Sequence, residues 1–257
     1  MDNRPKLIET ANLLLEISSL LMVAGANTHR VETSIDRFAS VLNLKTSSQI
    51  THKSIIMTLY DEKTDLSCTR VKNIPPYLIN FFIISSISKA SWTAISDQWN
   101  LEQIAEEIER IKTLKRYPRW IVLIAVSLAG AGFCNLFDGD YLNMLVAFIS
   151  TLIGLFLFQE THKLSYNLYI RIFLGSFVAS ACASMGMVFN IGSNPQTALM
   201  TSILFLVPGV PLINSFTDLL DGHIVNGVVR FTTGLMIVLA MALGLFLNLY
   251  LFHLKIR

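Results

Sequence analysis

The second half of the chain carries apolar residues in runs long enough to cross a membrane. Residues 172–217 contain no Asp, Glu, Lys or Arg. A soluble domain needs charged groups on its surface, whereas an ionised side chain at the centre of a bilayer costs about 2.5–3.5 kcal/mol on insertion scales. One spanning helix takes about 20 residues. The pattern therefore predicts a membrane-embedded helical bundle with spans near residues 120–137, 141–159, 170–190, 197–217 and 227–252.

The first 119 residues show shorter periodic segments. Apolar residues recur at helical spacing from Leu7 to Ala24, and Gly25 suits the end of that helix. Asn27 or Thr28 can cap a second helix, which ends near Leu42.

A change of period after residue 50 predicts β-structure. Residues 54–60 and 66–71 flank a polar turn, a pattern typical of a β-hairpin, and residues 49–51 can extend the first strand or form another. Residues 77–91 are apolar but short for a span, so they predict a core helix. Residues 101–114 predict a charged amphipathic helix.

Charge divides the chain into two expected domains. Of the 38 Asp, Glu, Lys and Arg residues, 28 lie in residues 1–119. We expect a small cytoplasmic α+β domain over residues 1–119, followed by a membrane α-helical domain of about five spans over residues 120–257. The N-terminus lacks the pattern of a signal peptide. Basic residues before the first span, including Arg116 and Arg119, put residues 1–119 in the cytoplasm by the positive-inside rule.

The fourth predicted span is interrupted by Pro208, Gly209 and Pro211. Each proline removes an amide donor, so the helix must kink or break, and a break within lipid is tolerated mainly beside protein or water. Broken helices bind substrates in many transporters, although a plain proline kink would give the same pattern. If this segment is re-entrant, the C-terminus returns to the cytoplasm; five full crossings would place it outside.

Polar residues that could carry chemistry follow the break. Asn214, Asp218 and Asp221 would share one face of a continuing helix. This face could line a polar path, with His223 exchanging protons, while Arg230 or Arg119 attracts a substrate carboxylate.

Several of these residues have a simpler interpretation. A loop with solvated charges explains Asp221 and Arg230 better, and a histidine beside such a loop, like His223, is more often polar surface; Asn214 follows directly on the break and is harder to explain in this way. Arg119 can instead anchor a basic-aromatic collar, together with Tyr117 and Trp120, at lipid headgroups.

The sequence carries no motif for nucleic-acid binding, catalysis or metal binding. The net charge of +2 and the absence of a basic stripe argue against nucleic acid as a partner. The chain has no Walker loop, GxSxG or HExxH motif, and its three cysteines are far apart. We expect no enzyme activity, no metal site and no cofactor.

Four stretches give the chain a resemblance to the threonine/serine exporter family, and in particular to the larger subunit of two-component bacterial exporters implicated in succinate efflux. They are residues 25–32 (GANTHRVE), 67–70 (SCTR), 116–120 (RYPRW) and 206–214 (LVPGVPLIN), the last followed by Asp218 and Gly222-His223.

The resemblance implies a multi-pass protein of the bacterial cytoplasmic (inner) membrane that exports amino acids such as threonine and serine, or dicarboxylates such as succinate. Single-chain members carry a further membrane region, so a smaller membrane subunit is the expected partner, besides the lipid bilayer. We expect the substrate or translocation site at Pro208, Gly209, Pro211, Asn214, Asp218, His223, Arg230 and Arg119.

Two other functions stay open from the sequence. The chain could be a non-transporting membrane scaffold or sensor, whose cytoplasmic domain binds a metabolite or a protein. It could also be an intramembrane enzyme that uses Asp218 and His223.

Overall fold

The computed structural model describes residues 4–76, 79–114 and 117–253. By their contacts, the residues fall into two compact units. The first unit comprises residues up to 115 together with 210–231, and the second comprises residues 116–209 together with those from 232 onward. Each unit is described separately below.

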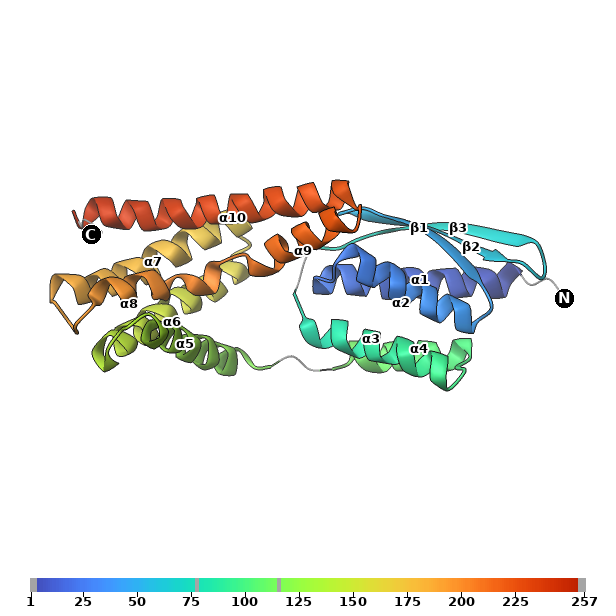
Figure 1. The fold of residues 1–257 in the computed structure, drawn as a ribbon, viewed down its shortest axis with the longest axis horizontal. Coiled ribbons are helices and arrows are strands. Elements are labelled where there is room, and N and C mark those ends of the chain that lie inside the picture. Colours follow the sequence, from blue (N-terminus) through green and yellow to red (C-terminus); the bar gives the residue numbers. More distant parts are fainter. Residues whose placement is uncertain (1–3, 77–78, 115–116, 254–257) are drawn as a thin grey trace. The chain divides into compact units, whose positions relative to one another are not determined.

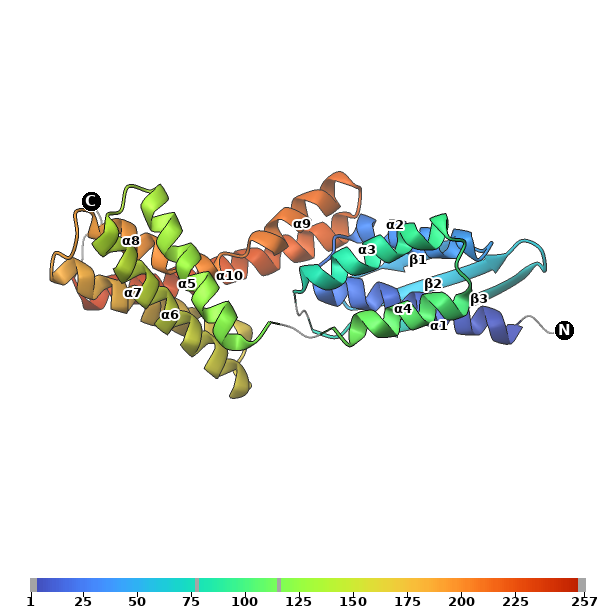
Figure 2. The same cartoon turned by 90° about the horizontal axis from the view of Figure 1, so that it is seen from below.

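The first unit has three layers, which Figures 1 and 2 show from two sides. A three-stranded antiparallel sheet forms one layer, with strand order β1-β2-β3. Helices α1 and α2 pack on the sheet, and α3 and α4 pack on the far side of these two helices. The bounds are α1 (Arg4–Ala24), α2 (Thr28–Val41), β1 (Lys45–Ile50), β2 (Ser54–Asp61), β3 (Leu66–Asn73), α3 (Phe81–Ser96) and α4 (Leu101–Lys112).

Residues 45–50 form a strand of their own, which decides one alternative that the sequence left open. β1 pairs with β2 from Lys45 opposite Tyr60 to Ile50 opposite Ile55. The predicted hairpin is confirmed as β2 and β3, which pair from Ser54 opposite Asn73 to Asp61 opposite Leu66. The helix expected over 77–91 begins later, at Phe81, because Asn80 caps it by accepting from the amides of Phe82 and Ile83; residues 77–78 lie outside the described residues.

A single apolar core holds the layers of this unit together. Ile55, Met57 and Leu59 alternate along β2 and are fully buried on the face toward the helices. They meet Leu14, Ile17 and Leu21 of α1 and Ile35 and Phe38 of α2, all in the same cluster of buried residues. Burial of this kind is the main favourable term in folding.

Helix α1 is long and apolar enough to cross a membrane, as are α5 (Arg119–Leu136), α6 (Tyr141–Lys163), α7 (Leu168–Val188) and α10 (Ile224–Leu251). However, 61% of the most apolar window of α1 is buried within the structure, against 22–39% for the other four helices. The apolar surface of α1 is thus already covered by protein. This difference favours α1 as a core helix of the first unit rather than as a span.

The second unit is a helical bundle. It contains α5 (Arg119–Leu136), α6 (Tyr141–Lys163), α7 (Leu168–Val188), α8 (Pro195–Ser202) and the short helix η1 (Leu204–Leu206). α6 packs on both α5 and α7, and α8 packs on all three. Many large apolar side chains point outward, among them Trp120, Leu128, Leu145 and Phe156. Such a surface suits lipid rather than water.

Small residues let the helices of the bundle approach closely. A Cβ atom added at Gly154 of α6 would lie 2.6 Å from the Cβ of Ala179 in α7, and one at Gly244 of α10 would lie 2.5 Å from the carbonyl oxygen of Phe173. Ser176 of α7 also donates to the carbonyl oxygen of Met241 in α10, at 2.8 Å.

The expected break in the fourth predicted span is present. Helices α8 and η1 end before Val207, and α9 (Gly209–Leu220) begins after Pro208. Pro211 lies in the first turn of α9, where its missing amide would have no helical partner in any case.

The sequence predicted a single domain boundary at residue 119, but the two units of the structure do not follow that boundary. Val210–Phe231, which includes most of α9 and the start of α10 (Ile224–Leu251), belongs with the first unit. The rest of α10, from Thr232 to Leu251, contains no Asp, Glu, Lys or Arg and is about 20 residues long, which is sufficient for one span. The membrane position of residues 120–257 stays a prediction.

The contact at Gly154 predicts the effect of one added methyl group. Gly154→Ala should lower the stability of the protein in detergent by about 1–3 kcal/mol, because the new Cβ overpacks the α6–α7 interface. Thermal unfolding of the full chain measures this. Gly132→Ala is the matched control, since a Cβ there meets nothing within 4 Å. Equal unfolding temperatures for the two variants would contradict close α6–α7 packing.

Candidate functional site

Helices α9 and α10 form a hairpin, defined here as residues Val210–Phe231, inside the first unit. The turn between them depends on Gly222, which has φ +86°, a conformation that favours glycine. The amide of His223 donates to the carbonyl oxygen of Asp218 at 2.8 Å and closes the turn. Helix α9 therefore ends where the sequence places Asp221-Gly222.

The hairpin packs against the α1–α2 turn, defined here as residues 25–28. In this turn Gly25 has φ +94°, and Asn27 caps α2 by accepting from the amide of Arg30 at 3.0 Å. The turn thus leaves the carbonyl groups of Gly25 and Ala26 and the amide of Thr28 available to the hairpin.

Three of the predicted site residues bind this turn directly. Asn214 Nδ2 donates to the carbonyl oxygen of Gly25 at 2.7 Å. Asp218 Oδ1 accepts from the amide of Thr28 at 2.8 Å. Arg230 Nη2 donates to the carbonyl oxygen of Ala26 at 2.8 Å. The structure therefore brings Asn214, Asp218 and Arg230 together on one short segment.

Asp218 and Arg230 also form a buried ion pair. Arg230 Nε lies 3.2 Å from Asp218 Oδ2, and their side chains are 3% and 0% exposed respectively. The interpretation of Arg230 as a solvated loop residue is therefore wrong, whereas Asp221 is indeed exposed. Away from water, each charge depends on the other, because an isolated buried charge is very costly.

Asn226 also follows the break in the sequence, where it received no role, and it completes the cluster. Its Nδ2 group donates to Thr28 Oγ1 at 3.0 Å and to the carbonyl oxygen of Ile50 at 2.8 Å. It lies four residues before Arg230 on α10, so the two side chains share a helix face. The spacing of Asn226 and Arg230 could be read from the sequence, but the burial of both side chains in one cluster could not. We call Asn214, Asp218, Asn226 and Arg230, with the α1–α2 turn, the hairpin cluster.

The hairpin cluster keeps unused hydrogen-bonding capacity. Among the described residues, Asp218 Oδ2, Asn226 Oδ1, and Nε and Nη1 of Arg230 are buried without a hydrogen-bond partner. The Asp218–Arg230 contact is at ion-pair distance but is not aligned as a hydrogen bond. Two of these four atoms, Asp218 Oδ2 and Arg230 Nε, face each other in the ion pair, so Asn226 Oδ1 and Arg230 Nη1 are the two that could bind a further polar group.

His223 lies at the edge of the same hairpin and pairs with Glu32 of α2. Its Nε2 atom is 3.2 Å from Glu32 Oε2, and both side chains are about a quarter exposed. Burial raises the pKa of Glu32; the charge of His223 opposes this rise and Asp36 adds to it. A carboxyl with a raised pKa beside an imidazole is a pair that can exchange a proton.

The remaining predicted residues lie outside the hairpin cluster. Pro208 lies in the break and Gly209 begins α9, both within the second unit, and Pro211 lies in the first turn of α9. Arg119 begins α5 in the second unit, where it donates to Gln159 at 3.1 Å and to Glu160 at 2.7 Å. With Trp120 exposed beside it, Arg119 fits the collar interpretation better than a role in substrate binding.

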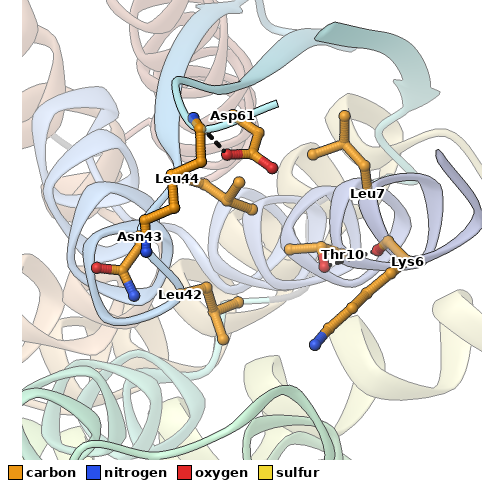
Figure 3. A pocket seen from close by; sticks show the side chains of 8 residues that line it. Lys6, Leu7, Thr10, Leu42, Asn43, Leu44 and Asp61 are labelled. Atoms are coloured by element: carbon orange, nitrogen blue, oxygen red, sulfur yellow. Dashed lines mark hydrogen bonds between the residues drawn. The ribbon is translucent and has the colours of Figure 1, made fainter. Parts of the chain in front are cut away.

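A separate pocket opens on the surface of the first unit, with a volume of about 210 Å³. Lys6, Leu7 and Thr10 of α1 face residues 42–44 and Asp61 across it (Figure 3). None of the predicted site residues lines it. The hairpin cluster, which contains three of them, is the better candidate for a functional site. Among the described residues, no group of three or more His, Cys, Asp or Glu could hold a metal.

The buried ion pair predicts non-additive effects on stability. Arg230→Met and Asp218→Asn should each lower the free energy of unfolding by about 3–5 kcal/mol, because each leaves an unpaired buried charge. The double variant should lose less than the sum, since it removes both charges. Denaturant unfolding of the full chain in detergent measures this. Arg119→Met is the control, because its exposed pair with Glu160 is worth about 0–1 kcal/mol. Additive losses would contradict the pairing.

His52, between β1 and β2, predicts a dependence of stability on pH. Burial, together with the charges of Arg230 and Lys53, lowers its pKa from the usual value of about 6.5. The folded state therefore binds this proton less readily than the unfolded state. The stability contribution of neutral His52 is complete above pH 6.5 and is lost as pH falls through the lowered pKa.

Between pH 7 and pH 5, the unfolding temperature of the wild type should thus fall more steeply than that of His52→Gln. Tryptophan fluorescence on heating measures both proteins. The raised pKa of Glu32 acts in the opposite direction, but it is common to both and cancels in the comparison. Parallel pH profiles would refute the assignment to His52.

Comparison with known proteins matches most of this chain to one protein family. Residues 12–252 match the ThrE family model, described as "Putative threonine/serine exporter". The chain is 27% identical to "Probable succinate transporter subunit YjjP" of Klebsiella aerogenes, and 26% identical to the protein of that name in Escherichia coli K12. Both alignments cover 95% of this chain and 94% of the relative.

A longer relative shares the same region. The chain is 18% identical to "Probable threonine/serine exporter" of Mycobacterium tuberculosis, over 93% of this chain but only 45% of that protein. No solved structure matches this chain significantly.

Proposed function

Because this chain belongs to the threonine/serine exporter family, we propose that it is one subunit of a secondary transporter that exports small carboxylates or amino acids across the bacterial cytoplasmic membrane. Its family and its apolar helices establish a multi-pass membrane protein of transporter type. The substrate, the direction of transport and the cytoplasmic position of the first unit belong to the proposal. The absence of enzyme activity is likewise part of it, and is consistent with the transporter names of the relatives.

The observation that carries the proposal is the buried hairpin cluster. It follows the helix break at Pro208-Gly209 in the sequence, and its buried atoms without a hydrogen-bond partner include Asp218 Oδ2, which pairs with Arg230 Nε, and Arg230 Nη1. A carboxylate of the substrate would accept a hydrogen bond from Arg230 Nη1. The guanidinium group of arginine is planar and its donors form a fork, an arrangement that matches a carboxylate. An ammonium group or a coupling proton would bind at Asp218 Oδ2.

The pair of His223 and Glu32 is proposed to exchange the coupling proton. It is partly open to water, unlike the ion pair, and His223 lies in the turn that joins α9 to α10, whereas Glu32 lies on α2. A change in its protonation would alter the contact between the hairpin and α2. This contact would then link proton binding to the position of the hairpin.

The break itself is proposed as the hinge of the transport cycle. Gly209 has open space around it, so its backbone can rotate without a steric clash. The cluster is closed in this structure, and substrate would reach it when the α1–α2 turn separates from the hairpin. Hinge residues of this kind absorb large changes in backbone angles.

A second, smaller membrane protein is proposed as the partner. The relatives from Klebsiella and Escherichia are named transporter subunits, which implies a further subunit in their complexes. The relative from Mycobacterium has more than twice the length that aligns with this chain. We propose that the partner supplies the corresponding membrane region.

Efflux from loaded vesicles tests the transport function. Vesicles containing the chain and its partner should release labelled threonine, serine or succinate, and Asp218→Asn should reduce release at least 10-fold. Arg230→Lys, which keeps the charge but loses the forked donor, should reduce it as well and guards against a variant that fails to fold. Asp221→Asn makes the same chemical change at an exposed position and should release normally.

Release of none of the three compounds would refute the transporter. Undiminished release by both Asp218→Asn and Arg230→Lys would refute the site but leave the transporter in place. The amount of folded protein in each vesicle preparation, measured by size-exclusion chromatography in detergent, must match the wild type.

One observation favours a metabolite sensor as the second candidate function. The whole hairpin cluster lies within the first unit, so this unit could bind a metabolite without transport. Binding of labelled substrate to the full chain without any flux in vesicles would support this alternative.

A further inference from the structure

We infer that Arg171, near the start of α7, binds the headgroup phosphate of an anionic phospholipid at one end of the helical bundle. The inference concerns the second unit alone and does not depend on the proposed substrate site in the hairpin cluster. It starts from an arginine for which the described residues supply no partner of opposite charge.

Three basic residues lie at the end of the bundle where α5 begins, α6 ends and α7 begins. Arg119 pairs with Glu160 at 2.7 Å, and Lys163 pairs with the same carboxylate at 2.8 Å. No described residue forms an ion pair or a side-chain hydrogen bond with Arg171, and its Nε atom is buried without a partner. The positive charge of Arg171 is therefore not compensated within the described part of the chain.

An aromatic ring holds the Arg171 side chain in place. Its Cζ atom lies 4.5 Å from the centre of the Phe158 ring on α6. A cation above an aromatic face is attracted to it, but the ring carries no negative charge that would balance the cation. The side chain is only half-buried, and a guanidinium has five N–H donors. Donors of Arg171 thus remain available to an acceptor from outside the protein.

The position of Arg171 along α7 places it within reach of lipid phosphates. Helix α7 has 21 residues, and at 1.5 Å per residue it is about 31 Å long, which matches the hydrocarbon core of a bilayer. Arg171 is three residues from the start of the helix, which is about 5 Å inside that core. Long basic side chains near a helix end extend to the headgroups from such a depth.

The surface around Arg171 suits lipid rather than water. Leu168 and Ile170 are exposed on the first turn of α7, and Tyr166 is exposed in the loop before it. Exposed apolar residues next to a tyrosine are typical of the boundary between acyl chains and headgroups. A phosphate that reaches Arg171 should therefore belong to a phospholipid rather than to a soluble metabolite.

The guanidinium group also determines which headgroup is preferred. Its planar fork of N–H donors matches two oxygen atoms of a phosphate. Its uncompensated charge favours a lipid with a net negative charge, such as phosphatidylglycerol. Phosphatidylcholine is a weaker match, because its own quaternary ammonium group balances its phosphate.

Lipid binding by the purified full chain in detergent tests the inference. Native mass spectrometry counts bound lipids as phosphatidylglycerol or phosphatidylcholine is added, and the wild type should bind phosphatidylglycerol more tightly. Arg171→Met, of similar length, should weaken the binding of phosphatidylglycerol about 10-fold and leave that of phosphatidylcholine unchanged. Arg171→Lys, which keeps the charge but loses the fork, should have an intermediate affinity.

Lys163→Met is the matched control. It removes one positive charge at the same end of the bundle, but this charge is already paired with Glu160. Its affinity for phosphatidylglycerol should therefore stay within about twofold of the wild type, since an exposed pair contributes little.

The unfolding temperature provides a second readout, which separates a lipid from free phosphate. Phosphatidylglycerol should raise the unfolding temperature of the wild type and of Lys163→Met more than that of Arg171→Met, whereas inorganic phosphate should raise none of them. Without lipid, Arg171→Met should unfold close to the wild type, because the charge that it removes has no protein partner.

Four results would overturn the inference. They are equal binding of phosphatidylglycerol by the wild type and Arg171→Met, an equal loss of binding in Lys163→Met, stabilisation by inorganic phosphate that Arg171→Met abolishes, and a large destabilisation of lipid-free Arg171→Met. The second would mean that only total charge matters, and the last would show that Arg171 has a partner within the protein.

Discussion

The first unit depends on a buried contact between opposite charges on consecutive helices. Asp218 at the end of α9 and Arg230 near the start of α10 pair at 3.2 Å with almost no exposure. Each also holds the α1–α2 turn, through Thr28 and Ala26 respectively. A buried pair of this kind stabilises weakly in net terms, but breaking it is costly, so it specifies one arrangement of the hairpin.

This contact connects two stretches that lie far apart in the sequence. Residues 25–32 and the segment from Asn214 to His223 both carry the resemblance to the family, and the structure joins them through Asn214, Asp218 and the pair of His223 and Glu32. The polar residues near the helix break are thus bound by protein groups of the first unit. Burial of these charged groups is costly, and the same groups are those that we propose bind a polar substrate.

The helices of the second unit are held together by different interactions, because the outer surface of this bundle is apolar. Its helices meet through small residues such as Gly154 and Ala179, and through serine hydroxyls that donate to carbonyl oxygens, as Ser176 does to Met241. These contacts need no water-driven collapse, which is absent in lipid. One chain thus contains a first unit whose core is stabilised by the burial of apolar side chains from water, and a second unit whose helices are stabilised by close packing against one another.

The sequence alone determined the element types, since hydrophobic period and capping residues are local: the hairpin of β2 and β3, the four long apolar helices and the break after Pro208 were all predictable. It also selected Asn214, Asp218 and Arg230 as polar residues in an unusual place. Only the tertiary structure showed that residues 210–231 pack with the first unit, that Arg230 is buried, and that Asn226 and Glu32 join them. The reason is physical: burial and pairing depend on partners some 200 residues away, as Thr28 is from Asp218, and no local pattern records which distant group will meet a given side chain.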